Sequence, residues 1–223
     1  MTTLMLAQSA GDLSPEGSSA IQLFVLIAAL SLLPALLFTV TGFTRILVVL
    51  GFIRTGLGTP SAPPNQVLVG IALFLTIFVM APVFTDIKDN AVEPLTKNKI
   101  TQTEALEIGQ KPLREFMFRQ TRTKDLALFL SLAKVDKPET RADVPTYVLI
   151  PAFIVSELKT AFQIGFLIFL PFLVIDLVVS ATLMSMGMVM LPPTFISLPF
   201  KILLFVLVDG WDLITRALVE SFQ

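Results

Sequence analysis

Charged side chains are rare in the last third of the sequence, so each one is a candidate functional group. The stretch 144–208 has only four, namely Glu157, Lys159, Asp176 and Lys201. An ionisable group within an apolar segment of membrane length is costly and by default marks a functional or assembly contact. Residues two apart on a helix lie on different faces, so Glu157 and Lys159 need different partners. We hypothesise that Glu157 pairs with Lys201, within or between subunits, with Asp176 as the other available partner. The alternative is that these charges are solvated at helix ends or snorkel to an interface.

Methionines recur at every second position in the same region. They are Met184, Met186, Met188 and Met190, with Gly187 among them and Pro192-Pro193 after them. Period two is not helical spacing, so the string predicts a loop or an extended turn. Irregular backbone at membrane depth survives only where protein covers it or where it lines a water-filled cavity. Flexible thioether side chains can close around objects of varied shape, which predicts a gasket at the constriction of a pore. The alternative is that the four methionines fill a hydrophobic core.

The sequence contains no set of residues typical of catalysis. It has no cysteine and no histidine, which excludes disulfides, thiol nucleophiles, imidazole bases and the usual zinc ligands. There is no phosphate-binding glycine loop and no serine beside a base. We therefore expect no enzyme activity, no metal and no cofactor. The balance of 16 basic and 17 acidic residues also disfavours nucleic acid as a partner.

The composition is typical of a membrane protein. Hydrophobic residues make up 54% of the chain and charged residues 15%, with a mean hydropathy of +0.82. Residues 86–143 hold 21 of the 33 charged side chains, while long stretches elsewhere hold none. This segregation indicates a membrane protein with one water-facing insert.

Two segments before the insert have the length and composition of membrane-crossing helices. The first is Ile21–Phe43, which exceeds the roughly 20 residues such a helix needs, and Pro34 is expected to kink it. Turn-forming residues occupy 55–66, and a second apolar helix is expected from Val67 onward. Pro82 marks the end of that second helix or a kink in it.

Helix-start signals within the insert predict a small helical unit. Thr101 or Thr103 is a candidate N-cap, and Thr123 is a candidate for the next helix. Pro112 is expected to restart a helix.

Together these patterns predict an all-α membrane protein of two kinked helical hairpins with a small helical insert. Its parts are an N-terminal segment (1–20), a first hairpin (21–85), the charged insert (86–143) and a second hairpin with the methionine-rich loop (144–223). Arg45 and Arg54, set against an acidic N-terminal flank, favour an amino terminus outside the cytoplasm. The insert would then be extracytoplasmic as well.

Three apolar segments carry a resemblance to a known family. They are RTGLGTPSAPPNQVLVGIALFLTIFVMAP, PAFIVSELKTAFQIGFLIFLPFLVIDLVV and MSMGMVMLPPTFISLPFKILLFVLVDGW. These segments resemble the FliP family of bacterial flagella, and together they span most of the apolar sequence. The insert and the amino terminus carry less of the likeness.

The resemblance implies a core subunit of the flagellar type III export gate, a gated conduit for unfolded flagellar proteins during flagellum assembly. It implies a homo-oligomer, pentameric by resemblance, that assembles with FliQ, FliR, FlhB and FlhA at the basal body in the bacterial inner membrane, with a periplasmic insert. A single chain of this size cannot enclose a protein-wide passage, so a ring or helical stack of copies is expected. Met184 through Met190 would seal the closed channel, and Glu157 and Lys201 would belong to inter-helix or inter-subunit packing. The alternatives are the equivalent subunit of a virulence injectisome, or a small-solute channel or transporter subunit.

Overall fold

The computed structural model describes residues 23, 24, 27, 28, 31, 34–59, 61–135, 138–188 and 190–223. The chain divides into two compact units, Met1–Leu37 and Phe38–Gln223. Every regular element among the described residues is a helix, which confirms the all-α class. The segment 1–20 and much of the expected helix Ile21–Phe43 lie outside the described residues.

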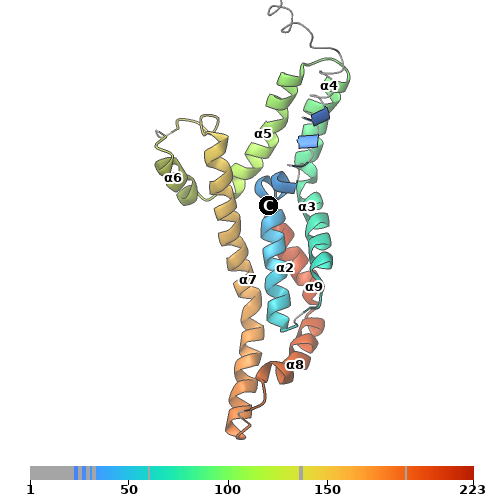
Figure 1. Ribbon diagram of the computed structural model, residues 1–223, viewed down its shortest axis with the longest axis vertical. Helices are drawn as coiled ribbons and strands as arrows, with labels where there is room; N and C mark the ends of the chain where they lie inside the picture. The colour runs from blue at the N-terminus through green and yellow to red at the C-terminus, as the bar shows by residue number, and fades with distance from the viewer. Residues whose placement is uncertain are drawn as a thin grey trace, which may run out of the picture. The chain divides into compact units, whose positions relative to one another are not determined.

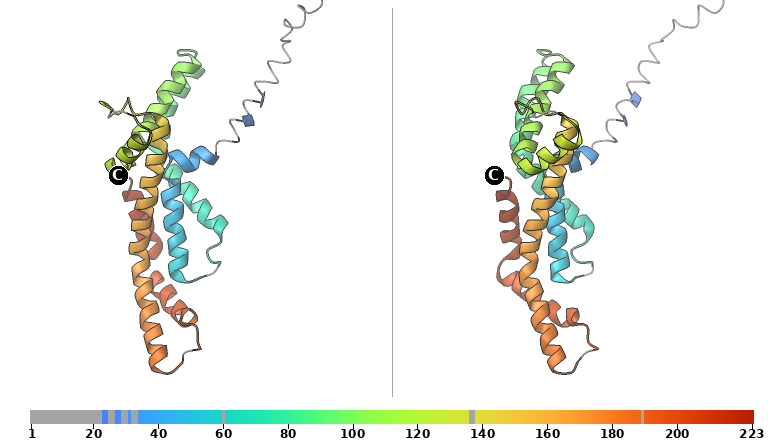
Figure 2. Two further views of the ribbon diagram at one scale, coloured as in Figure 1. Left: turned by 60° about the vertical axis from the view of Figure 1, so that its left-hand side comes forward. Right: turned by 90° about the vertical axis from the view of Figure 1, so that its left-hand side faces the viewer.

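The helices of the second unit are shown in Figure 1. In chain order they are α2 (Phe43–Leu57), α3 (Asn65–Ile87), the π-helical turn η1 (Lys88–Val92), α4 (Glu93–Thr96), α5 (Gln102–Gln120), α6 (Thr123–Leu132), α7 (Thr146–Ser185), α8 (Pro193–Leu207) and α9 (Gly210–Glu220). α2 lies between α7 and α3, and α8 packs back against the C-terminal part of α7 (Figures 1 and 2). α6 packs on the N-terminal part of α7.

Within the part of the chain that the structure describes, two continuous helical stretches are long and apolar enough to cross a membrane. They are Asn65–Thr96 and Thr146–Ser185, whose most apolar 18 residues have mean hydropathies of 2.7 and 2.5. The first confirms the apolar helix expected from Val67 onward. The 40 residues of α7 correspond to about 60 Å, roughly twice the thickness of a bilayer's hydrocarbon core. Only part of α7 can therefore lie in that layer.

The turn expected at 55–66 connects α2 to α3. α2 ends at Leu57, and Gly58 follows in the left-handed conformation with φ 74°. Its N–H donates to the carbonyl of Thr55 at 3.1 Å, which satisfies a backbone acceptor at the helix end. Pro64 precedes α3, so the prolines and the glycine occupy the connection itself.

Prolines interrupt the helices less than the sequence suggested. α3 passes through Pro82 to Ile87 and continues into η1, so Pro82 does not end the helix. Pro112 lies inside the continuous helix α5, and the expected restart there is wrong. α7 likewise contains Pro151 and Pro171. An interior proline costs roughly 3 kcal/mol of helix stability, so packing must offset that cost, and Pro112 is itself buried.

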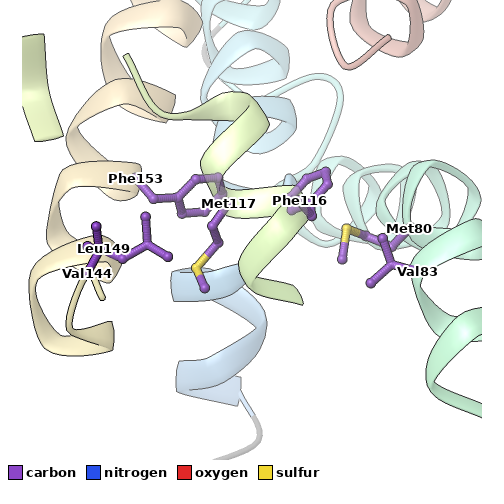
Figure 3. Close-up of a cluster of buried hydrophobic side chains, with 7 residues drawn as sticks. All are labelled: Met80, Val83, Phe116, Met117, Val144, Leu149 and Phe153. Atoms are coloured by element: carbon purple, nitrogen blue, oxygen red, sulfur yellow. The ribbon is translucent and has the colours of Figure 1, made fainter. Parts of the chain in front are cut away.

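The charged insert shares a hydrophobic core with the apolar helices (Figure 3). The cluster consists of Met80 and Val83 from α3, Phe116 and Met117 from α5, Val144 just before α7, and Leu149 and Phe153 in the first turns of α7. α5 therefore packs between two apolar helices and is fixed relative to both. The boundary expected at 85/86 falls inside the helical run from α3 to η1, and the one at 143/144 falls inside this core.

One of the predicted helix caps is present and another is displaced by a residue. Thr101 caps α5 with a capping box, in which Glu104 N–H donates to Thr101 Oγ1 at 3.3 Å and Thr101 N–H donates to Glu104 Oε2 at 2.8 Å. These bonds, the backbone one foremost, hold the pKa of the Glu104 carboxyl below its usual value. Thr123 is the first residue of α6 rather than its cap, since Arg122 takes that position.

Candidate functional site

A buried arginine joins two apolar helices. Arg45 lies in the first turn of α2 and is 1% exposed, while Glu157 lies in α7 and is 0% exposed. Arg45 Nε donates to Glu157 Oε2 at 3.1 Å, and Arg45 Nη2 pairs with Glu157 Oε1. This fork-to-fork geometry uses both carboxylate oxygens, which is the arrangement that a planar guanidinium favours. The pair therefore fixes α2 against α7.

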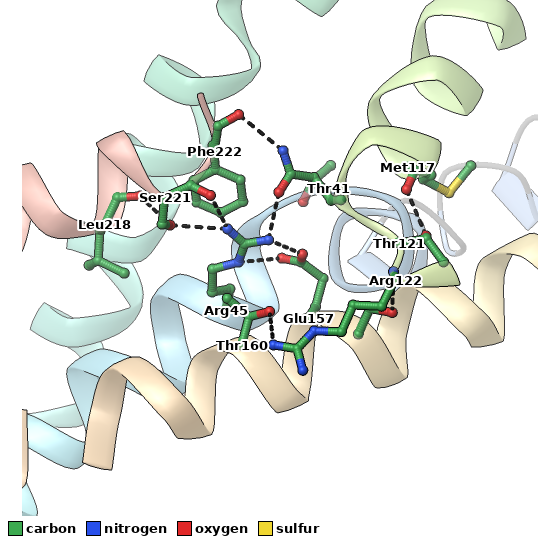
Figure 4. Close-up of polar contacts among 12 residues, drawn as sticks. Thr41, Arg45, Met117, Thr121, Arg122, Glu157, Thr160, Leu218, Ser221 and Phe222 are labelled. Atoms are coloured by element: carbon green, nitrogen blue, oxygen red, sulfur yellow. Dashed lines mark hydrogen bonds and ion pairs between the residues drawn. The ribbon is translucent and has the colours of Figure 1, made fainter. Parts of the chain in front are cut away.

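The same guanidinium holds the C-terminal residues (Figure 4). Arg45 Nη1 donates to the carbonyl of Ser221 at 2.7 Å and to its hydroxyl at 3.0 Å. Arg45 Nη2 donates to Gln120 Oε1 at 2.8 Å, and Gln120 Nε2 donates to the carbonyl of Phe222 at 3.0 Å. The Phe222 ring stands 3.9 Å from the guanidinium carbon in a cation–π contact. We call Arg45, Glu157, Gln120, Ser221 and Phe222 the arginine hub.

The expected pairing of Glu157 with Lys201 is wrong within the chain. Lys201, which is buried, donates from Nζ to Asp176 Oδ2 at 2.6 Å, and Ser197 Oγ donates to Asp176 Oδ1 at 2.6 Å. Asp176 is 19 residues beyond Glu157 on the same helix, which corresponds to about 28 Å. Lys201 reaches Asp176 because α8 folds back along the C-terminal part of α7, far from Glu157.

Two signals in the sequence could have identified these partners. Asp176 and Lys201 stand 12 and 13 residues from Met188, so a chain that reverses there brings them side by side. Arg45 stands between two apolar runs and is a charge that needs a partner. Sequence reasoning used Arg45 only to orient the chain and did not consider it as the partner of Glu157.

Lys159 has a partner in α6, which the sequence did not indicate. It pairs with Asp125, which is buried in α6 and also accepts a hydrogen bond from Ser156 Oγ at 2.9 Å. The backbone N–H of Arg122 donates to the same Ser156 hydroxyl at 3.0 Å. The hydrogen bond from Lys159, opposed by burial and aided by Ser156, holds the pKa of Asp125 below its usual value. This cluster anchors α6 to α7.

The methionine-rich segment forms the turn between α7 and α8, as expected in outline. α7 extends to Ser185, so Met184 lies in its last helical turn rather than in a loop. Gly187 has φ 76°, and the N–H of Met188 donates to the carbonyl of Leu183 at 2.9 Å, a bond typical of a glycine-terminated helix. The four methionine side chains are exposed, from 40% for Met188 to 97% for Met190. In this chain they do not fill a core. We call residues 184–190 the methionine turn, although Val189 lies outside the described residues.

The arrangement of charges is suited to holding helices together. Among the described residues, each buried side-chain nitrogen or oxygen has a hydrogen-bond partner. No group of three or more Asp or Glu side chains in that part of the chain is placed to hold a metal ion. The paired charges therefore act as fixed connections between α2, α6, α7, α8 and the C-terminal residues.

Comparison with known proteins gives a consistent result. The profile of the FliP family matches residues 26–218. A protein of Bacillus subtilis (strain 168) named flagellar biosynthetic protein FliP is 58% identical over 209 residues, which are 93% of this chain and 95% of that relative. Proteins of the same name from Pectobacterium carotovorum and Caulobacter vibrioides are 55% and 53% identical. They are covered over 78% and 76% of their lengths, with 91% of this chain aligned in each case.

Proposed function

Because the chain belongs to the FliP family, we propose that it is a core pore-forming subunit of the flagellar type III export gate. In that role it provides a gated conduit through which unfolded flagellar proteins leave the cell during flagellum assembly. The names of its relatives, all flagellar biosynthetic proteins, favour this role over use in an injectisome. The gate lies in the bacterial inner membrane at the flagellar basal body, with the insert on the periplasmic side.

The observation that carries the proposal is the methionine turn. Its side chains are exposed at one end of the long apolar pair α7 and α8. Large apolar side chains exposed together are costly in water, so their place is against lipid or other protein. Thioether chains can repack around a passing polypeptide of varied shape and close again when it has left. In the proposed gate, Met184, Met186, Met188 and Met190, with Gly187 at the turn itself, form the gasket.

Exposed apolar surface along the helices supports assembly with other subunits. Phe74 on α3, Leu167 on α7 and Leu207 on α8 are all largely exposed. Such surface belongs against lipid or against neighbouring helices. One chain of this size cannot surround a passage wide enough for a polypeptide, so several copies are required. FliQ and FliR complete the assembly in this proposal, FlhB joins it, and FlhA lies nearby.

The proposed mechanism is passive. The ion pairs Arg45–Glu157 and Lys201–Asp176 keep the helices in register, and the methionine turns limit leakage through the closed gate. This chain catalyses no reaction in the proposed mechanism and uses no cofactor. The energy for export is supplied by another protein or by the membrane gradient.

The test is a leak measurement on the assembled gate. Replacing Met186, Met188 and Met190 by alanine shortens three gasket side chains, and we expect small-solute leak through the closed gate to increase. The matched control replaces three other exposed apolar residues of α8 by alanine, namely Ile202, Leu203 and Val206. A leak that is unchanged in the methionine variant, or equally raised in the control, would refute the gasket role.

A further inference from the structure

A pocket rich in positive charge lies between α5 and the loop that precedes α7. It has a volume of about 470 Å³, which is within the range of small-molecule sites. Among the described residues, four basic side chains and one acidic side chain line it, a net charge of +3. The ring of Phe118 adds an apolar wall. We call this site the basic pocket, and its charged members are Lys111, Arg114, Arg119, Arg141 and Glu115.

Within the described residues, none of the four basic side chains of the pocket forms an ion pair. The ion pairs found there all involve other basic residues. Glu139 and Asp143 belong to the same loop but do not line the pocket. The Asp143 carboxylate accepts hydrogen bonds from the N–H and the hydroxyl of Thr140, at 2.8 and 2.7 Å. Even the whole of segments 111–122 and 138–145 contains five basic and three acidic residues. The positive charges repel one another, so a bound anion would be favoured.

Arg114 holds the loop that carries Arg141 against α5. Its Nη2 donates to the carbonyls of Val144 at 2.7 Å and of Arg141 at 3.2 Å, and its Nη1 donates to Thr146 Oγ1. The guanidinium carbons of Arg114 and Arg141 stand 5.6 and 5.8 Å from the centroid of the Phe118 ring. Both guanidiniums are therefore held beside one ring by cation–π contacts. Because they are already ordered, less side-chain freedom is lost when a ligand binds.

We propose that the basic pocket binds a phosphate monoester group. Such a group carries about −1.5 to −2 charges at pH 7 and three acceptor oxygens. A single carboxylate brings one negative charge, so the phosphate matches a net charge of +3 more closely. Three of the four basic residues are arginines, whose planar donors fit phosphate oxygens with two parallel hydrogen bonds. Arg119 and Arg141 are exposed and supply these bonds, while the fixed guanidinium of Arg114 supplies charge.

Two kinds of molecule present this chemistry. A soluble phosphate monoester carries the group free in solution, and phosphatidic acid carries the same group at a membrane surface. The pocket is far from the methionine turn, because Arg114 contacts Thr146 at the first residue of α7, whereas the turn lies at the other end of that helix, around Ser185. Phosphate binding therefore does not depend on the proposed export role, and the failure of either proposal leaves the other standing.

The test measures binding to the full chain in detergent. Glycerol 3-phosphate is titrated by calorimetry, with succinate, a dianion of two carboxylates, as the matched anion at equal ionic strength. In a second arm, native mass spectrometry counts the lipids bound from mixed micelles that contain either phosphatidic acid or phosphatidylcholine. We expect saturable binding of the phosphate monoester, tighter than that of succinate or of phosphatidylcholine. Binding of glycerol 3-phosphate would assign a soluble source, and binding of phosphatidic acid alone would assign a lipid.

Substitutions of exposed residues, which leave the core intact, locate the site. Arg141→Gln should weaken binding by about tenfold or more, the effect of losing one hydrogen bond to a charged group. Glu115→Gln removes the acidic side chain of the lining and should strengthen binding. Lys99→Gln is the matched control, because it removes a positive charge from the same insert outside the pocket, and binding should not change. The proposal is overturned if neither arm shows saturable binding, or if Lys99→Gln weakens binding as much as Arg141→Gln. Tighter binding of succinate or of a glutamate-rich peptide would also overturn it.

Discussion

The buried pair of Arg45 and Glu157 can be tested by substitution. The expected loss in the free energy of unfolding follows from the hydrogen bonds that each substitution removes. Arg45 donates five, of which two go to Glu157 and three go to Ser221 and Gln120. Removing one member of a buried ion pair costs about 3–5 kcal/mol. Glu157→Met leaves the arginine three acceptors, so we expect a loss of about 3 kcal/mol in the free energy of unfolding, at the lower end of that range.

Arg45→Met should cost more. It removes both side-chain hydrogen bonds to a carboxylate that is 0% exposed, and it also releases the C-terminal Ser221. We expect Arg45→Met to lower the free energy of unfolding by about 5 kcal/mol, at the upper end of the range for a broken buried pair. The double variant strands no charge and should cost no more than Arg45→Met alone. The two single losses sum to about 8 kcal/mol, so the coupling energy should be at least about 3 kcal/mol.

The single tryptophan provides the assay. Trp211 packs edge-on against Phe205 with ring centroids 5.4 Å apart, so its fluorescence reports on the junction of α8 and α9. Equilibrium unfolding in detergent, followed by this fluorescence, gives the free energies of unfolding of the unmodified chain, the two single variants and the double variant. Ser221→Ala is the control, because it keeps both charges and removes one hydroxyl, at about 1 kcal/mol. Additive single losses, or single losses no larger than that control, would refute the reasoning.

Three further outcomes are expected in the same unfolding assay. The pKa of Asp125 is below its usual value in the folded chain, mainly through its hydrogen bond from Lys159. The stabilisation by Asp125 should therefore be complete above the ordinary carboxyl pKa of about 3.9 and be lost as pH falls through the pKa of the folded state. Asp125→Asn should remove that part of the pH dependence of stability. An unchanged pH profile in this variant would contradict the assignment to Asp125. Gly165→Ala places a Cβ 2.4 Å from the Phe52 ring of α2 and should lower the free energy of unfolding by roughly 1–3 kcal/mol. Gly51→Ala has no atom within 4 Å of the added Cβ and should be neutral or slightly stabilising. Equal effects of the two variants would contradict the packing of α2 on α7. Thr101→Ala removes the cap of α5 and should cost about 1 kcal/mol, while Thr101→Ser should retain most of the stability.

Local patterns in the sequence predicted the features that depend on local physics. The apolar helix after Val67, the turn around Gly58 and the cap at Thr101 each depend on a few neighbouring residues. Of the two outcomes expected at Pro82, a helix end or a kink, the end was wrong, and so was the restart at Pro112, for a related reason. The intrinsic cost of an interior proline can be read from sequence, but the packing that offsets the cost comes from α5 and α7, which are distant along the chain.

The partners of the buried charges could not be obtained from local patterns. Arg45 and Glu157 are 112 residues apart, and their contact requires α2 to lie along α7. Phe222 completes the site from near the other end of the sequence. The methionine turn was predicted because alternation and glycine act locally, but the inclusion of Met184 in α7 was not. The role of this turn in a pore stays a prediction that the leak measurement tests.

Because α7 is long, a small tilt near Glu157 would move its C-terminal end by a large distance. Glu157 and Ser185 are 28 residues apart on this helix, a distance of about 42 Å. A tilt of about 10° about the arginine hub as pivot would displace the distant tip by about 7 Å, more than one full turn of a helix. A tilt of this size at the hub would thus be a movement larger than a methionine side chain at the tip. In the proposed gate, substitutions near Arg45 should therefore alter the closure of the passage from a distance.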